Sequence, residues 1–267
     1  MSDTVRVESV NRRLVEKGRA LLDTPRRGLV KLAQDPEADS LLNDLTGHPH
    51  AYVLACLVDR NVRAEVAWML PLRIKERTGS FDINDLARLD ERDWLRVMTE
   101  PSPAHRFPTN MSRVVHRAIT RIVDQYGGDA SRIWSDSPSS AALVRRFLEF
   151  HGAGPKIATM AANILVREFR VKISDFRYID ISADVHVVRV MSRLGLVRQG
   201  AGTDEVVYAA RELNPDFPGI IDPPIWFLGR DICKPKPRCA YCYLSDLCPH
   251  RLGIRGGEMP EAEVHEP

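Results

Sequence analysis

The stretch that decides the fold reads HGAGPK, residues 151–156, and it separates two segments with helical periodicity. Gly152 and Gly154 allow the positive φ angles of a tight turn and leave room for another molecule to approach the backbone. Pro155 suits the first position of a helix, because its fixed φ matches the helix and its missing N–H has no partner there. The stretch therefore predicts a hairpin between two helices.

The start of the second helix is also a predicted anion site. The first N–H groups of a helix have no partner inside it, so they bind phosphate well. A Gly-x-Gly turn alone ends helices in many proteins, but here Pro155 and Lys156 follow it, and then an alanine-rich helix. This combination is typical of a helix-hairpin-helix motif that contacts a DNA phosphate through Gly152 and Gly154.

Helical periodicity dominates the rest of the chain, which predicts a mostly α protein. Residues 113–124 place apolar side chains on one face and Arg113, Arg117 and Arg121 on the other, as a basic stripe. Residues 171–182 alternate as a strand would, so they form either a small β element or an extended loop. The other expected helices cover residues 11–22, 50–70, 141–150 and 155–169.

Composition places the chain among folded proteins, since 44% of its 267 residues are hydrophobic and 28% are charged. No apolar run approaches the roughly 18 residues of a membrane span, and the N-terminus lacks the apolar core of a signal peptide, so we expect no membrane partner and a cytoplasmic protein. The net charge is only +2. The tail, residues 257–267, holds four Glu and no Lys or Arg, which predicts disorder there and leaves a formal +6 on the remainder.

Four of the five cysteines lie within sixteen residues and are spaced C-x5-C-x2-C-x5-C: Cys233, Cys239, Cys242 and Cys248. A structural zinc site usually draws two C-x2-C pairs from separate turns. One such pair between two long arms favours the wider [4Fe-4S] cluster, with zinc as the alternative. Cys56 lies in an apolar helix and is expected to be a buried, inert thiol.

Two residues at helix starts carry candidate chemistry. Lys156 is either a phosphate contact or solvated surface lysine, or a nucleophilic amine. Asp184 precedes the helical segment VHVVRV and suits the N-cap of that helix. An amine and a carboxylate, brought together, can attack and stabilise an electron-poor sugar carbon.

The HGAGPK hairpin, the Asp184-Val185-His186 element and the cysteine window, in this order, resemble the endonuclease III branch of the helix-hairpin-helix DNA glycosylases. The resemblance covers residues 46–250. It implies an all-α, two-lobed fold: a six-helix barrel over residues 46–179, and a cluster lobe made of residues 1–45 and 180–256. Double-stranded DNA with a damaged base or an abasic site is the implied partner, and a monomer is expected.

The same resemblance implies the chemistry. Lys156 matches the lysine that attacks C1′ of the damaged nucleotide, and Asp184 matches the aspartate that assists. It implies base-excision repair by a DNA N-glycosylase with AP-lyase activity on oxidised pyrimidines, acting through a Schiff base and β-elimination. The cluster loop would present three basic residues to phosphates: Lys234, Lys236 and Arg238. Two alternatives stay open: a glycosylase for mismatched, alkylated or deaminated bases, and a non-catalytic iron-sulfur DNA-binding protein.

The chain also departs from the family pattern. The first cysteine arm has five intervening residues where the family commonly has six, and the connection over residues 168–183 is longer. Where the family often has a glutamine that fills the gap left by the flipped base, this chain has Arg60 and Asn61, so either is a candidate for that role. Phe107, in a proline-rich loop, is either a wedge between bases or a buried loop anchor.

Overall fold

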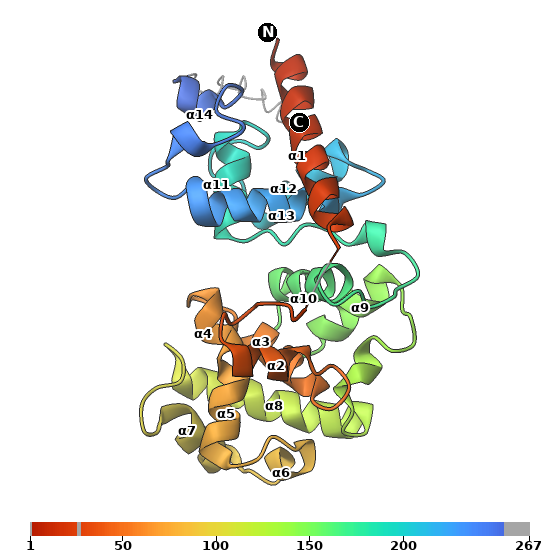
Figure 1. Cartoon of the computed structure of the whole chain (residues 1–267), viewed down its shortest axis with the longest axis vertical. Coiled ribbons are helices and arrows are strands. Elements are labelled where there is room, and N and C mark those ends of the chain that lie inside the picture. The colour runs from red at the N-terminus through yellow and green to blue at the C-terminus, as the bar shows by residue number, and fades with distance from the viewer. Residues whose placement is uncertain (1, 26–27, 254–267) are drawn as a thin grey trace, which may run out of the picture. The chain divides into compact units, whose positions relative to one another are not determined.

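The computed structural model describes residues 2–25 and 28–253, and every regular element in them is helical (Figure 1). The all-α prediction is therefore confirmed for the described chain. Residues 171–182 form an extended loop with one short turn, η2 (Phe176–Tyr178), and no strand. In this part of the chain no helix is both long and apolar enough to span a bilayer. The acidic residues 257–267 lie outside the described range.

The chain divides into two compact units. The hairpin unit is Pro25–Ile179, and the cysteine unit joins Met1–Thr24 to Asp180–Pro267. The predicted lobes divide at residue 45, and these lobe bounds stay a prediction, whereas the first division between these units falls at Thr24. Its cause is α2 (Pro36–Asn43), which packs on other helices of the hairpin unit, and Asp39, whose buried carboxylate accepts hydrogen bonds from the backbone of Leu32 and Ala33.

The hairpin unit is built around one helix, α3 (Pro49–Val58), whose ten residues are all buried. Tyr52 of α3 donates a 2.7 Å hydrogen bond to the carbonyl of Ala161, which joins α3 to α10. Each large apolar side chain buried here contributes about 1.5–3 kcal/mol to folding. The helices that complete the unit are α4 (Ala64–Trp68), α5 (Leu70–Thr78), α6 (Ile83–Ala87), α7 (Glu91–Thr99), α8 (Pro108–Tyr126), η1 (Ala130–Ile133), α9 (Ser140–Leu148) and α10 (Pro155–Arg167).

The single helix predicted over residues 50–70 is wrong, because the structure divides it into α3, α4 and the start of α5. Asp59 leaves the helical conformation with a ψ of 72°. Asn61 then adopts a φ of +55°, a left-handed conformation that asparagine tolerates better than most residues. The resulting turn, residues 59–63, carries three of the side chains that matter for the site below.

The cysteine unit combines the N-terminal helix of the chain with the described residues from 180 onward. In Figure 1 the red α1 (Asp3–Asp23) runs beside the blue C-terminal elements, and it packs on η3 (Pro218–Ile221) and α13 (Asp222–Phe227). The approach is so close that a Cβ on Gly18 would lie 2.0 Å from the carbonyl oxygen of Ile220. The remaining elements are α11 (Val185–Arg193), α12 (Thr203–Leu213), the π-helical turn η4 (Leu228–Ile232), η5 (Cys239–Tyr241) and α14 (Pro249–Leu252).

Candidate functional site

The predicted hairpin is present between α9 and α10. Gly152 has a φ of +84°, as the tight turn requires. Gly154, expected to share this conformation, instead has an extended backbone with a φ of −108°, because it is the N-cap of α10. No atom lies within 4 Å of a Cβ built on Gly154. The glycine that turns the chain and the glycine that leaves room for an approaching phosphate are therefore different residues.

Arg60 is hydrogen-bonded to this hairpin. Its Nη2 donates hydrogen bonds of 2.7 Å to the carbonyls of Gly152 and Leu57, and its Nε donates to Leu57 as well. Asn61 is exposed, and no hydrogen bond of its side chain is found among the described residues. Of the two candidates for filling the gap left by a flipped base, only Asn61 has a side chain that is not already engaged.

Lys156 lies in the first turn of α10, directly after the hairpin, with about a third of its side chain exposed (32%). Its Nζ is 3.1 Å from Oδ2 of Asp59, whose side chain is only 11% exposed. Nζ also lies 3.4 Å from the carbonyl oxygen of Asp59 and 3.6 Å from the sulfur of Met160. The sequence analysis missed Asp59. The signal that could have found it is an acidic residue that ends an entirely apolar helix.

Asp184 is the N-cap of α11, which confirms the simpler of its two predicted roles. Its Oδ1 accepts hydrogen bonds of 2.8 Å from the backbone N–H groups of His186 and Val187. Val185, next in the chain, is 73% exposed. Asp184 belongs to the cysteine unit and Lys156 to the hairpin unit, so its predicted assistance to Lys156 stays a prediction.

Phe107 is exposed at the start of α8. The residue is 42% exposed, and the guanidinium of Arg106 lies 5.3 Å from the ring centroid. The loop is anchored instead by the buried His105, whose Nε2 is 3.1 Å from the carbonyl of Val58 at the end of α3. Phe107 is thus not a buried anchor, and it keeps an apolar ring available at the surface.

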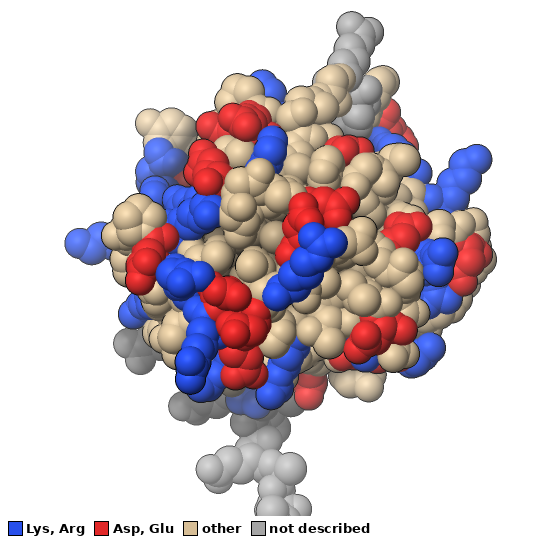
Figure 2. Space-filling model, turned by 90° about the horizontal axis from the view of Figure 1, so that it is seen from below, with Lys and Arg blue, Asp and Glu red and all other residues tan. Residues whose placement is uncertain are grey.

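The basic stripe of α8 is partly neutralised. Arg121 pairs with Glu149, which also pairs with Arg145. Arg117 is exposed and lies 3.0 Å from Nδ1 of His151 in the hairpin, and partial burial together with the nearby positive charges lowers the pKa of this histidine. Figure 2 shows a face on which basic and acidic side chains are interspersed, so the positive charge is not gathered there.

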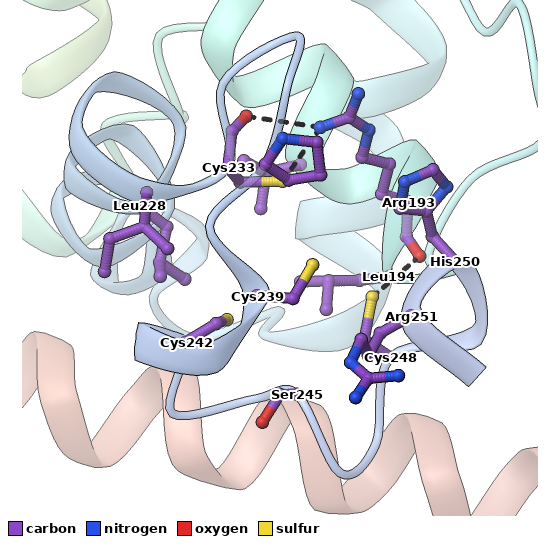
Figure 3. Close-up of a pocket in the computed structure, with 13 residues that line it drawn as sticks. Arg193, Leu194, Leu228, Cys233, Cys239, Cys242, Ser245, Cys248, His250 and Arg251 are labelled. Carbon is purple, nitrogen blue, oxygen red and sulfur yellow. Dashed lines mark hydrogen bonds between the residues drawn. The ribbon is translucent and has the colours of Figure 1, made fainter.

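The four clustered cysteines border one pocket of the cysteine unit, between the C-terminal loop and α11 (Figure 3). Leu194, Leu228 and Ile232 give this pocket apolar walls. Burial raises the pKa of Cys242 and Cys248, and the neighbouring thiols raise it further. Among the described residues, no three ligand side chains are already arranged around a single metal ion.

Arg193 of α11 holds the first arm of this loop. Its Nη1 lies 3.4 Å from the sulfur of Cys233 and donates a 2.6 Å hydrogen bond to the carbonyl of Lys234, while its own carbonyl is 3.3 Å from the sulfur of Cys248. The three basic loop residues expected to meet phosphates are all exposed: Lys234, Lys236 and Arg238.

Cys56 is apart from this cluster. Its thiol is fully buried in α3, and burial raises its pKa far above the ordinary value. A thiol in such surroundings stays protonated and unreactive, as its apolar sequence context predicts.

Comparison with known proteins agrees with the resemblance seen in the motifs. No model of a known protein family matches the chain. Endonuclease III of Thermotoga maritima is 31% identical over 133 residues, which are 49% of this chain and 53% of that protein. Endonuclease III of Bacillus subtilis is 26% identical over 144 residues, or 52% of this chain and 55% of that protein. The matched stretches span about half the length of these relatives.

Solved structures show the fold over nearly the whole chain. A trapped covalent intermediate of endonuclease III with DNA superposes with a TM-score of 0.63 and 18% identity, covering 92% of this chain and 97% of that one. A thermostable thymine-DNA glycosylase superposes with a TM-score of 0.57 and 15% sequence identity, covering 94% of this chain and 100% of that one. The predicted fold, that of the endonuclease III-like helix-hairpin-helix glycosylases, is therefore confirmed.

Proposed function

We propose that this chain, which has the endonuclease III-like fold, is a base-excision repair DNA N-glycosylase with AP-lyase activity on damaged pyrimidines in duplex DNA. The observation that carries the proposal is the position of Lys156 in the first turn of α10, directly after the hairpin, with about a third of its side chain exposed. A hairpin that binds phosphate and a lysine beside it put an amine next to the sugar of the bound strand.

The reaction divides between two side chains. A damaged base must leave the helical stack before the enzyme reaches its sugar. As the base departs, positive charge develops on the sugar, and a carboxylate stabilises it. We assign that carboxylate to Asp184, which keeps Oδ2 available because its N-cap bonds use Oδ1. Lys156 then forms a Schiff base with C1′, through which the 3′ phosphate is lost by β-elimination.

The cysteine loop fits a [4Fe-4S] cluster. Four thiols from one short loop border a single pocket with apolar walls, and Arg193 directs an N–H toward the sulfur of Cys233. In a cluster each cysteine binds a different iron, so the sulfur atoms need not meet around one ion as they do in a zinc site. Four thiols of one loop around one pocket, without two C-x2-C pairs from separate turns, therefore favour the cluster. Its role would be to stabilise the loop that carries Lys234, Lys236 and Arg238.

A second candidate is a glycosylase of the same fold for mismatched, alkylated or deaminated bases. The hydrogen bond between Arg60 and Gly152 favours this second candidate. Because Arg60 is held at the hairpin, a different residue from the usual glutamine has to fill the gap left by the flipped base. A panel of duplexes, each carrying one lesion, separates the two candidates. Excision of an oxidised pyrimidine is expected, and excision of another lesion class alone would select the second.

Borohydride trapping on abasic-site DNA tests the central chemistry. Reduction of a Schiff base leaves a covalent protein-DNA adduct, which we expect from the natural chain and not from Lys156→Ala. Lys75→Ala is the matched control, since it removes a lysine of the same unit that pairs with Glu37 and leaves the amine at residue 156. No adduct with the intact protein would support the non-catalytic DNA-binding alternative instead.

A further inference from the structure

The contact between Lys156 and Asp59 is the strongest feature that the proposed function does not explain. Nζ and Oδ2 are 3.1 Å apart, within the range of a hydrogen bond through which a proton can pass. The two residues are 97 positions apart in the chain and belong to the same compact unit. The pair is therefore a product of the fold and not of a local motif.

The surroundings fix this carboxylate firmly. Asp59 is the C-cap of the buried helix α3, and its backbone N–H bonds to the carbonyl of Cys56. The next residue, Arg60, donates a hydrogen bond to the hairpin that precedes Lys156. The end of α3 and the start of α10 are thus held together by Arg60 as well as by the ion pair. Only 11% of the Asp59 side chain is exposed, so little water competes for its oxygens.

A protonated lysine cannot act as a nucleophile, because its nitrogen has no free electron pair. Among the described residues of the hairpin unit, Nζ has three hydrogen-bond acceptors: the carbonyl oxygen of Asp59, the sulfur of Met160 and Oδ2 of Asp59. A peptide carbonyl and a thioether are too weakly basic to take a proton at neutral pH. Oδ2 of Asp59 is the remaining acceptor, and it is also the nearest.

We propose that Asp59 is a further catalytic residue, which accepts the proton of Lys156 when the amine attacks C1′ of the sugar. The inference rests on the proposed function and adds a carboxylate distinct from Asp184. Proton transfer from Nζ to Oδ2 leaves a neutral amine and a carboxylic acid. The nitrogen pair then forms the N–C1′ bond with the open-chain aldehyde of an abasic site, and the C=O π electrons move to oxygen.

The carboxyl group of Asp59 also carries the later proton transfers of the reaction. Asp59 returns its proton to the new alkoxide and then accepts the second proton of the nitrogen. The hydroxyl leaves as water after protonation, while the nitrogen pair forms the C=N bond of a protonated Schiff base. An ammonium and an aldehyde thus give an iminium ion and water, and Asp59 ends as the carboxylate with which it began. No oxidant or reductant is needed.

The test separates proton transfer from simple positioning. Asp59→Asn keeps the size and one hydrogen-bond acceptor but removes the basic oxygen, Asp59→Glu restores a carboxylate, and Asp136→Asn is the matched control, an aspartate paired with Arg146 in the same unit. Each variant is compared for unfolding temperature, for affinity to a duplex with a tetrahydrofuran abasic analogue, which lacks the aldehyde, and for the single-turnover rate of borohydride trapping on a natural abasic site.

We expect Asp59→Asn to bind the analogue within about twofold of the natural chain and to trap at least about 10²-fold more slowly, the usual loss when a general base is removed. Asp59→Glu should recover part of the rate, even if Asp59→Asn folds poorly, and Asp136→Asn should keep all of it. Trapping by Asp59→Asn at the natural rate or faster, with Lys156→Ala inactive, would overturn the role of Asp59 alone. No trapping by the natural chain would overturn the proposed function and this role together.

Discussion

Nη2 of Arg60 and the carbonyl oxygen of Gly152 are joined by a 2.7 Å hydrogen bond that links the turn after α3 to the hairpin before α10. The same guanidinium bonds to Leu57, so it spans both elements. A planar guanidinium with several fixed donors suits such a bridge better than a flexible ammonium. The arginine thereby sets the position of the hairpin relative to the end of the central helix.

Replacement of Arg60 should cost stability. We expect Arg60→Ala to lower the free energy of unfolding by about 1–3 kcal/mol, because charge-assisted hydrogen bonds to two backbone carbonyls are lost. Arg63→Ala is the control, because Arg63 is exposed in the same turn and its side chain makes no cap hydrogen bond, so this change should leave the free energy of unfolding unaltered. Chemical denaturation of both variants measures the difference. Equal stabilities would mean that the bridge contributes nothing measurable to the fold.

Replacement of Asp184 by asparagine should separate its two roles. Asparagine caps a helix about as well as aspartate, so Asp184→Asn should retain stability, DNA binding and abasic-site cleavage but lose base excision. Asp184→Ala removes the cap as well and should cost about 1 kcal/mol of stability. Excision assays on lesion DNA, run beside binding measurements, report the result. A parallel loss of binding in Asp184→Asn would leave only the capping role.

The arginines of α8 should differ in their contribution to DNA binding. Arg113→Ala and Arg117→Ala should each reduce the slope of log affinity against log salt by about one, as expected for a lost phosphate contact. Arg121→Ala should not, because Glu149 already compensates its charge. Titration of duplex DNA at several salt concentrations gives the slopes. Slopes equal to that of the natural chain in all three variants would mean that none of these arginines contacts a phosphate.

Local patterns of the sequence were enough to predict the helical class, the hairpin and the long amphipathic helix α8. Each of these depends on residues that are close in the chain: apolar side chains at helical spacing in α8, and the turn chemistry of Gly152 and Pro155 at the hairpin. The N-cap role of Asp184 was predictable for the same reason, since a cap bonds only to the next few residues.

Features that depend on distant contacts were not predictable. The break after α3 was missed because apolar residues continue on both sides of the turn at residues 59–63. The pairing of Asp59 with Lys156 joins residues far apart in the chain, and no pattern within either segment reports it. The division between compact units after Thr24 was not predicted, because α2 has no signal of its own that shows which neighbours it packs against.

The buried His50 should make the hairpin unit sensitive to acid. Its Nε2 is 2.9 Å from the carbonyl of Phe81, its ring stacks on that residue, and burial lowers its pKa from 6.5 to about 4. In the unfolded chain the imidazole takes up a proton near pH 6.5, whereas the folded chain resists until about pH 4. Stability from this residue is therefore complete above pH 6.5 and is lost progressively down to pH 4.

Between pH 6.5 and pH 4, the titration of His50 lowers the free energy of unfolding by at most about 3 kcal/mol, since each pKa unit is worth about 1.4 kcal/mol. His50→Gln retains a donor for the carbonyl of Phe81 but does not titrate, so its stability should fall less between pH 6.5 and 4. His116→Gln, on the surface of α8, serves as the control. Urea unfolding across this pH range makes the comparison. The same pH dependence in the His50 variant and the natural chain would contradict the assignment.

Loss of one clustered cysteine should remove the cofactor, whereas loss of the buried cysteine should not. We expect the natural chain to carry about four iron atoms, with the broad visible absorbance of iron-thiolate bonds. Cys239→Ser should lose most of the iron and destabilise the loop that Arg193 holds. Cys56→Ala should keep its iron, although the cavity it leaves in α3 costs some stability. Metal analysis, absorbance and unfolding temperature are measured on all three proteins, and a natural chain with one zinc and no iron would exclude the cluster.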